Sequence, residues 1–419
     1  MTTHRSEIFA ISDEYIDITG RMSPISATAL GIPGYDHLLD DFSIAAETKA
    51  ADYRREVLSR IKAMAPIDDI DRIAKEVLIE RVEASLKLFD TKEGFVTYGP
   101  IANPVSSIRS IFSLMNTDGP EAIANVTSRL NAIGTALDSW KSTIEDMQAL
   151  GKGTSRRQVL AVAEQLETQG SDGYAEMARS LDPEGKYPEL HLAAQNGEAA
   201  CLSMSAWMRD VHAPRSLDID GVGEERYAPW ARYFTGADLD LRTTYEWGVK
   251  DLQEINDRMY KAAEKLGLAG KSLREVAEYC EDAELHRIEG VDNLLKKLKE
   301  FTEEAIERVD GVYFDIDPRV RFCDVRLAPE GSAAAPYYMV PSEDLSRPGT
   351  TWYPTMGHTT FNFWHFASTW YHEAVLAITC NLEQQLLRKI DLPDSNAPKR
   401  GSAVMVKVGL YMLSDLWTS

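Results

Sequence analysis

The stretch that decides the fold class is "GPEAIANVTSRLNAIGTALDSWKSTIEDMQAL", residues 119–150. Its apolar residues recur every three or four positions, which is the spacing of one face of an α-helix. Pro120 suits the first turn of a helix, and Gly151 suits the position after the last turn. The stretch therefore predicts one long amphipathic helix whose apolar face packs into a core.

The same helical spacing continues on both sides of this stretch. "SIAAETKAADYRREVLSRIKAMA" (43–65) and "IDDIDRIAKEVLIERVEASLKLF" (67–89) precede it, and "SRRQVLAVAEQLETQ" (155–169) follows, with Ser155 in place for an N-terminal cap. We expect further helices over 186–213, 240–266, 272–285 and 291–309. The expected role of these apolar faces is core packing rather than cofactor binding.

Two short segments break the helical pattern and predict strands. "RVRFCDVRLAP" (319–329) alternates, and "PYYMVP" (336–341) is short and aromatic. We expect a loop over 342–360 and a helix over 361–378. The predicted fold is mainly α, with a large helical body and a small β-sheet next to a helix that contains a histidine–glutamate pair. No repeat or low-complexity linker divides it, so one continuous domain is expected.

Composition limits the classes of partner. The 419 residues carry a net charge of −21, with 44% hydrophobic and 26% charged residues, as in soluble globular proteins. An acidic surface repels phosphate, so we expect no nucleic-acid partner. No apolar run reaches membrane-spanning length, and the first twenty residues lack an apolar signal segment. Four scattered cysteines (Cys201, Cys280, Cys323 and Cys380) predict reduced thiols. We expect a cytoplasmic protein with no membrane partner.

The pair His372–Glu373 resembles the start of a zinc-hydrolase helix. Such helices carry H-E-x-x-H, because histidines four residues apart share one face and can bind one ion. Leu376 stands where the second histidine belongs. His358 and His365 precede His372 at intervals of seven, which is about 10 Å along a helix and too far to share one ion directly. Taken alone, the pair favours an ordinary half-buried helix over a metal site.

Several separated segments together resemble one family. They are "SPISATALGIPGYDHLLDDFS" (23–43), 232–255, 298–321 and "YYMVPSEDLSRPGTTWYPTMGHTTFNFWHFASTWYHEAV" (337–375). In this order they resemble the bacterial domain-of-unknown-function 885 family, from about residue 10 to residue 375. Members of that family are similar to zinc metallopeptidases of the HE-helix type.

The resemblance implies a site. His372 would be a zinc ligand, and Glu373 would be the general base that acts on a zinc-bound water. Zinc is the cofactor expected in the intact family member, and a peptide-like molecule is the expected substrate. Tyr338 is a weaker candidate to stabilise an oxyanion, as is its neighbour Tyr337, because both lie on the predicted strand beside the helix. Packing is the favoured role of both rings.

The resemblance stops after Val375. The family continues with Pro-Gly-His-His-Leu-Gln and later Gly-His-Gly-Glu-Gly-Trp-Ala-Leu-Tyr-Ala-Glu, and neither motif occurs in residues 376–419. Residues 376–381 can be encoded by CTG GCC ATC ACC TGC AAC with a C before them. Read one base earlier, this gives CCT GGC CAT CAC CTG CAA, which encodes the first motif. The same shift over residues 403–418 can yield the second motif.

The choice of synonymous codons in this reconstruction is limited, because methionine and tryptophan have one codon each. This applies to Met405, Met412 and Trp417. We infer from the sequence that a base was lost near the codon of Val375. Residues 1–375 would then be an incomplete metallohydrolase-type domain, and 376–419 would be an out-of-frame tail. Such a chain is expected to be inactive and not to bind zinc tightly. The alternative is a non-catalytic helical binding protein that has kept the body and lost the site.

Overall fold

Helices make up most of the chain in the computed structural model. The model describes residues 6–313, 316, 318–329, 335–339, 341 and 347–372, apart from the side chains of Leu285, Val320 and His365. The proposed base Glu373 and the tail 376–419 lie outside the described residues.

The first eight helices are α1 (Glu7–Met22), α2 (Pro24–Leu30), α3 (Ile44–Ala63), α4 (Asp69–Thr91), α5 (Glu93–Val96), α6 (Pro104–Ile111), α7 (Pro120–Ala149) and α8 (Arg156–Gly170). The next seven are α9 (Gly173–Leu181), α10 (Pro188–Trp207), α11 (Glu224–Thr235), α12 (Leu241–Lys265), α13 (Leu273–Asp282), α14 (Val291–Val309) and α15 (Phe363–Trp370). A π-helical turn, Met208–His212, extends α10. The mainly α fold predicted from the sequence is confirmed.

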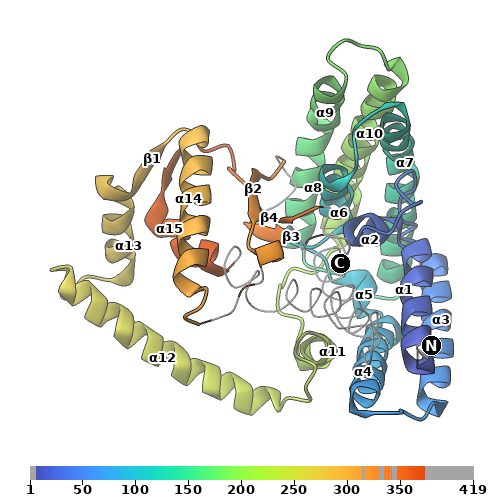
Figure 1. Ribbon diagram of the computed structural model, residues 1–419, viewed down its shortest axis with the longest axis horizontal. Helices are drawn as coiled ribbons and strands as arrows, with labels where there is room; N and C mark the ends of the chain where they lie inside the picture. The colour runs from blue at the N-terminus through green and yellow to red at the C-terminus, as the bar shows by residue number, and fades with distance from the viewer. Residues whose placement is uncertain are drawn as a thin grey trace.

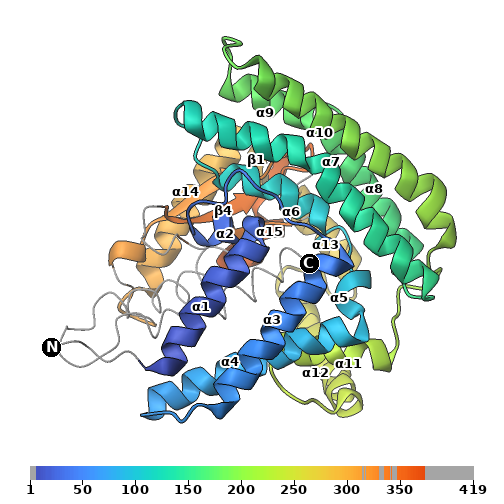
Figure 2. The same ribbon diagram turned by 90° about the vertical axis from the view of Figure 1, so that its right-hand side faces the viewer.

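Helices α1 to α11 form the larger, helical half of the molecule (Figure 1). The long helices α7, α8 and α10 pack along one another on one side of this half, while α1, α3 and α4 lie together on the other (Figure 2). Two apolar clusters hold these groups: one is built around α6 to α10, and the other around α1, α3 and α4. In these helices the helical periodicity therefore marks core faces, as expected. For the predicted helices 240–266 and 272–285 the expectation of core packing is wrong, because α12 buries one residue and α13 buries none.

Local chemistry explains several helix ends. The side chain of Ser43 caps α3 by accepting a hydrogen bond from the backbone N–H of Ala46. The side chain of Asp68 caps α4 by accepting one from the backbone N–H of Asp71. Pro120 occupies the first turn of α7, where no backbone donor is needed. Lys92 ends α4 in the left-handed region with φ 67°, which turns the chain directly into α5.

The described residues of the smaller half contain five short strands in two sheets. They are β1 (Arg287–Glu289), β2 (Cys323–Leu327), β3 (Tyr337–Met339), β4 (Gly349–Tyr353) and β5 (Thr360–Asn362). β1 pairs antiparallel with β5, and the other sheet has the order β2-β4-β3, with β2 parallel and β3 antiparallel to β4. The two strands predicted from the sequence are β2 and β3.

The expected loop 342–360 instead contains the central strand β4 and the first residue of β5. β4 pairs with a strand on each side, so its conformation is set by long-range pairing rather than by an alternating pattern of its own. The helix that follows begins at Phe363, after Asn362, whose side chain accepts from the backbone N–H of Trp364.

The two faces of the three-stranded sheet have different neighbours. On one face, Tyr337 stacks on Trp352 with ring centroids 6.2 Å apart, and this pair packs with Ala328 against Leu114 of the helical half. On the other face, Val325 and Tyr353 join α14 and α15 in a separate cluster. The sheet therefore lies between the helical half and α15 (Figure 1).

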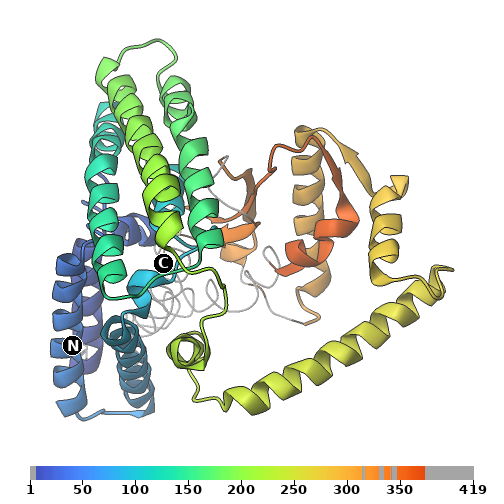
Figure 3. The same ribbon diagram turned by 180° about the vertical axis from the view of Figure 1, so that it is seen from behind.

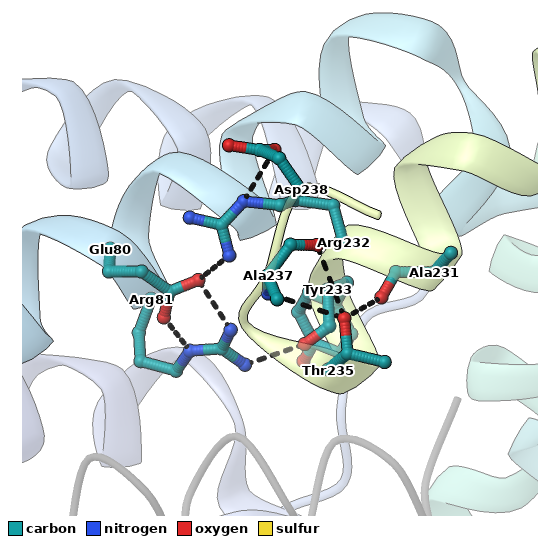
Figure 4. Close-up of polar contacts among 8 residues, drawn as sticks. All are labelled: Glu80, Arg81, Ala231, Arg232, Tyr233, Thr235, Ala237 and Asp238. Carbon is teal, nitrogen blue, oxygen red and sulfur yellow. Dashed lines mark hydrogen bonds and ion pairs between the residues drawn. The ribbon is translucent and has the colours of Figure 1, made fainter. Parts of the chain in front are cut away.

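Helix α11 is fastened to α4 by polar contacts (Figure 4). Arg81 donates to the carbonyl of Tyr233 at 2.7 Å, and its guanidinium lies 5.5 Å from the centroid of the Tyr233 ring. Arg232 donates to Glu80 at 2.6 Å and pairs with Asp238 at 3.1 Å. Burial alone would raise the pKa of Glu80. The guanidinium groups of Arg81 and Arg232 outweigh this effect and hold that pKa below its usual range.

Helix α12 bridges the two halves along one edge of the molecule (Figure 3). Of its 25 residues only Ala263 is buried, and its main packing partner is α13. Tyr245, Leu252 and Met259 recur every seven residues on it and are all exposed. Among the described residues, every exposed phenylalanine, tryptophan or tyrosine lies between residues 227 and 371. The smaller half and its bridge thus leave much more aromatic surface uncovered than the helical half does.

Candidate functional site

The predicted site lies at the end of α15, which aromatic packing holds in place. Trp370 is fully buried, and its indole N–H donates to the hydroxyl of Thr302 on α14 at 2.9 Å. Phe301 of α14 meets Tyr371 edge-on, with centroids 4.7 Å apart. Tyr353 of β4 packs against Trp370 from the sheet, with centroids 6.1 Å apart. The last turn before the histidine–glutamate pair is therefore fixed from two sides.

His372 follows this anchored turn directly. After Trp370 the helical geometry widens to a π-helical turn at residues 371 and 372, and the side chain of His372 is exposed. Local π-helical geometry often occurs at functional sites in helical proteins. His372 is thus accessible to a ligand, while its neighbour two residues earlier is buried in the core.

A cavity of about 700 Å³ runs beside α15. Phe366 and Thr369 line it from α15, and Tyr353 lines it from β4. His372 lies three residues beyond Thr369, close to the same side of the helix. The volume is within the range of small-molecule sites, and His372 lies outside the lining of the cavity.

The other side of this cavity carries charge. Glu281 and Asp282, at the end of α13, and Arg287 of β1 line it. Asn362 ties this wall to α15 by donating to the carbonyl of Glu281 at 2.6 Å. These residues lie 85 to 91 positions before His372 in the sequence, and nothing in the sequence pattern associates them with it. The pairing of β1 with β5 and the hydrogen bonds from Asn362 to α13 bring them to the side of α15.

Tyr338 lies on the face of the sheet that looks toward α15. It is paired with Thr351 across the antiparallel ladder, and residues directly opposite share a face. Thr351 and Tyr353 share that face because side chains alternate along a strand, and Tyr353 contacts α15. Tyr337 is on the opposite face, stacked on Trp352. The structure therefore gives Tyr337 a packing role and leaves Tyr338 as the candidate.

The hydroxyl of Tyr338 is buried and has no hydrogen-bond partner among the described residues. A buried polar group without a partner costs about 1–3 kcal/mol. The hydroxyl is thus a buried donor without a described partner on the α15 side of the sheet. Such a donor is the type of group that stabilises a developing oxyanion.

The described residues do not complete a zinc site. Within the described parts of the chain there is no group of three histidine, cysteine, aspartate or glutamate side chains that could hold a metal ion. His358 lies in the turn before β5 and His372 after α15, so the stripe spaced by seven does not run along one helix. His372 is the part of the predicted ligand set that the structure describes.

Comparison with known proteins adds the family. The model of the family described as "Bacterial protein of unknown function (DUF885)" matches residues 24–375. The chain belongs to this family. The DUF885 match ends two residues after Glu373, at the position where the sequence resemblance stops.

Two solved structures share the DUF885 chain's fold. A crystal structure from Colwellia psychrerythraea, described as a "putative lipoprotein", has a TM-score of 0.75 and 14% identity and covers 98% of this chain and 80% of its own. A "putative lipoprotein of unknown function" from Shewanella oneidensis has a TM-score of 0.59 and 16% identity. The match covers 98% of this chain and 78% of the Shewanella chain. No curated protein matches this chain. Among the described helices, none is long and apolar enough to cross a membrane.

Proposed function

We propose that the intact protein is a zinc-dependent hydrolase of peptide-like amides, and that the present chain is a form interrupted after Val375. Three features that coincide near residue 375 support the proposal. The family match ends there, the histidine–glutamate pair lies just before it, and a one-base shift there can recover both missing motifs with suitable synonymous codons. In the intact reading His372 binds zinc and Glu373 takes a proton from the attacking water.

The surroundings of α15 support a site that binds substrate at this place. His372 is exposed on a turn that Trp370 anchors, and a cavity of about 700 Å³ leads along the same helix. Tyr338 offers a buried hydroxyl from the sheet face that looks toward α15. These groups can position an amide carbonyl, but without the second half of the ligand set this chain is expected to be inactive.

The first test is the DNA sequence from the codon of Thr360 to beyond the stop codon after Ser419. One inserted base should restore "HEAVPGHHLQ" and an open frame beyond it. Codons that cannot encode those motifs would remove the basis of the proposal, and a helical binding protein that lacks catalysis would then be the better description.

The second test is made on the restored chain. It should bind zinc and hydrolyse peptides, and Glu373→Gln should lower kcat by about 100-fold or more while zinc content is kept. His372→Ala should lose the zinc, whereas Tyr338→Phe should lower kcat and leave zinc content unchanged. Full activity in Glu373→Gln would show that another group is the base.

A cytoplasmic location is also part of the proposal. Fractionation of cells that express the protein at its native level, with a blot of cytosol and membranes, tests it directly. Recovery in the membrane fraction would contradict it.

A further inference from the structure

A second cavity lies inside the helical half, far along the chain from the histidine–glutamate pair. Its volume is about 250 Å³, and it is found where three apolar clusters meet. Tyr98 and Trp140 line it from the cluster of α6 to α10, and Phe89 lines it from the cluster of α1, α3 and α4. Trp230 and Tyr233 of α11 close a further side.

The walls of this cavity are aromatic and held in place. Tyr98 meets Trp140 edge-on with centroids 5.2 Å apart, and its hydroxyl hydrogen-bonds His212 at 2.6 Å. Trp230 donates to Thr97 at 3.0 Å, and the contacts to α4 shown in Figure 4 fix Tyr233. Because these rings are pinned by neighbours, the cavity is a preformed space rather than a gap that side chains could fill by changing rotamer.

The charges at the cavity are predominantly negative. Asp40, Asp41 and Glu47 line it, and Arg54 is the one basic side chain among its described lining residues. Arg54 hydrogen-bonds Glu47, so the positive charge present is already engaged. The two aspartates give the cavity an unbalanced negative charge.

Asp40 is the carboxylate that lacks a cation. It accepts from the hydroxyl of Ser23 at 2.6 Å and from the backbone N–H of Ile25 at 2.8 Å, which are neutral donors. In the described parts of the chain no lysine or arginine forms an ion pair with it. The nearby Arg129 directs its Nε–H and one terminal NH2 group to Thr28 and to backbone carbonyls of residues 35 and 38, and its other terminal nitrogen has no hydrogen-bond partner among the described residues. Burial raises the pKa of Asp40 to about 6, in part offset by these hydrogen bonds and by Arg129.

The rings near the cavity are of the kind that attract cations. The Lys92 ammonium lies 4.5 Å from the centroid of Phe89, and the Arg81 guanidinium lies 5.5 Å from that of Tyr233. An aromatic face stabilises a cation by about 0.5–2 kcal/mol, depending on how far water is excluded. Aromatic walls with an unpaired carboxylate are therefore complementary to a positively charged group with an apolar body.

We propose that this cavity binds a small organic cation, a protonated amine attached to an aromatic or aliphatic group. The ammonium would lie between the free lone pairs of Asp40 and the face of Trp230, and the apolar body would lie against Trp140. The volume of about 250 Å³ limits the ligand to one ring or a short chain, because typical drug-sized ligands occupy larger sites. The proposal does not depend on the metal site or on the reading frame after Val375.

The test compares a charged probe with a neutral probe of the same shape. Phenethylamine and 2-phenylethanol are titrated into the full chain at pH 7.5 by calorimetry. The amine should bind with a dissociation constant near or below 1 mM and at least about tenfold more tightly than the alcohol. Equal affinity for the two probes, or no saturable binding of the amine up to about 20 mM, would overturn the proposal.

Two aspartates of the same loop provide a matched pair of variants. Asp40→Asn should lower amine affinity at least tenfold and leave alcohol binding unchanged. Asp36→Asn is the control, because Asp36 also accepts a side-chain hydrogen bond, from Thr28 at 2.6 Å, yet does not line the cavity. Equal losses in both variants would point to a disturbed loop and would refute the assignment to Asp40.

A ring variant keeps the proposal testable if Asp40→Asn does not fold. Trp230 is half-buried at the cavity, and Trp230→Leu retains an apolar side chain but removes a face for the cation. The amine should then bind at least about threefold more weakly, while the alcohol changes less. Unchanged amine affinity would exclude a cation held between Asp40 and this ring.

Discussion

Replacing Thr302 by valine should destabilise the smaller half of the molecule. Thr302 and Trp370 are both buried, at 2% and 0% exposure, and the indole N–H has the threonine hydroxyl as its acceptor at 2.9 Å. Valine has nearly the same shape and a similar helix propensity. The substitution leaves the indole N–H without an acceptor and also removes the bond that the threonine hydroxyl donates to the carbonyl of Leu298 at 2.8 Å. The expected cost is about 1–3 kcal/mol in the free energy of unfolding.

Urea unfolding followed by circular dichroism and tryptophan fluorescence measures this cost. With a slope of about 2 kcal/mol per M, the midpoint of the transition that reports on the smaller half should fall by about 0.5–1.5 M. A double-mutant cycle isolates the cause. In a Trp370→Phe background the donor is absent, so Thr302→Val should cost less than about 0.5 kcal/mol. An equal cost in both backgrounds would refute the reasoning, because it would show that the hydrogen bond does not carry the effect.

Four further outcomes are expected. Gly170→Ala should lower the free energy of unfolding by about 1–3 kcal/mol, because a Cβ there would lie 2.9 Å from the carbonyl of Glu198 across the α8–α10 contact. Gly134→Ala is the control: its Cβ would lie an ordinary 3.7 Å from Ala200, and it should stabilise the protein by about 0.5–1 kcal/mol. Thermal unfolding measures both. Arg81→Ala should raise amide exchange in α11 by roughly 5- to 30-fold, since it loses the bond to Tyr233, while Arg72→Ala on the exposed side of α4 should not. Burial raises the pKa of Asp40 to about 6 from 3.8, so the native state binds this proton more tightly than the unfolded chain does. The group's contribution to stability therefore falls as pH rises from about 4 to about 6, and the gain of Asp40→Asn over the parent should grow across that window and then level off in urea titrations. The exposed row on α12 should cause concentration-dependent self-association in sedimentation velocity, which Leu252→Lys weakens and Gln253→Lys does not.

Periodicity in the sequence predicted the long helices well. The stretch 119–150 corresponds to α7 at Pro120–Ala149, and the expected helix 291–309 corresponds to α14 at Val291–Val309. These segments carry apolar residues that repeat on one helical face, and residues that favour a helix start or stop lie at their ends. Both signals are local in the sequence. Strands β2 and β3 were also predicted, because short β-branched and aromatic runs bounded by proline are local signals as well.

Non-local pairing explains what the sequence did not reveal. Strand β4 has its conformation because β2 and β3 pair with it, and β1 is a strand only through β5, more than 70 residues later. For the same reason Glu281 and Arg287 were not expected beside α15. The sequence did single out Tyr338, but only the register with Thr351 separates its face from that of Tyr337.

The length of α12 has a mechanical consequence. In the part of the chain that the structure describes, the two halves are joined by this helix and by contacts of the sheet region with the helical half. One such contact is the hydrogen bond that Arg347 donates to the carbonyl of Ala29 at 2.9 Å. Its 25 residues form a strut of about 37 Å. Removing seven residues would shorten the strut by about 10 Å and turn its far end by only about 20°, whereas removing five would turn it by about 140°. Either change would strain the contacts between the sheet region and the helical half. The relative placement of the two halves therefore depends on the length of one exposed helix.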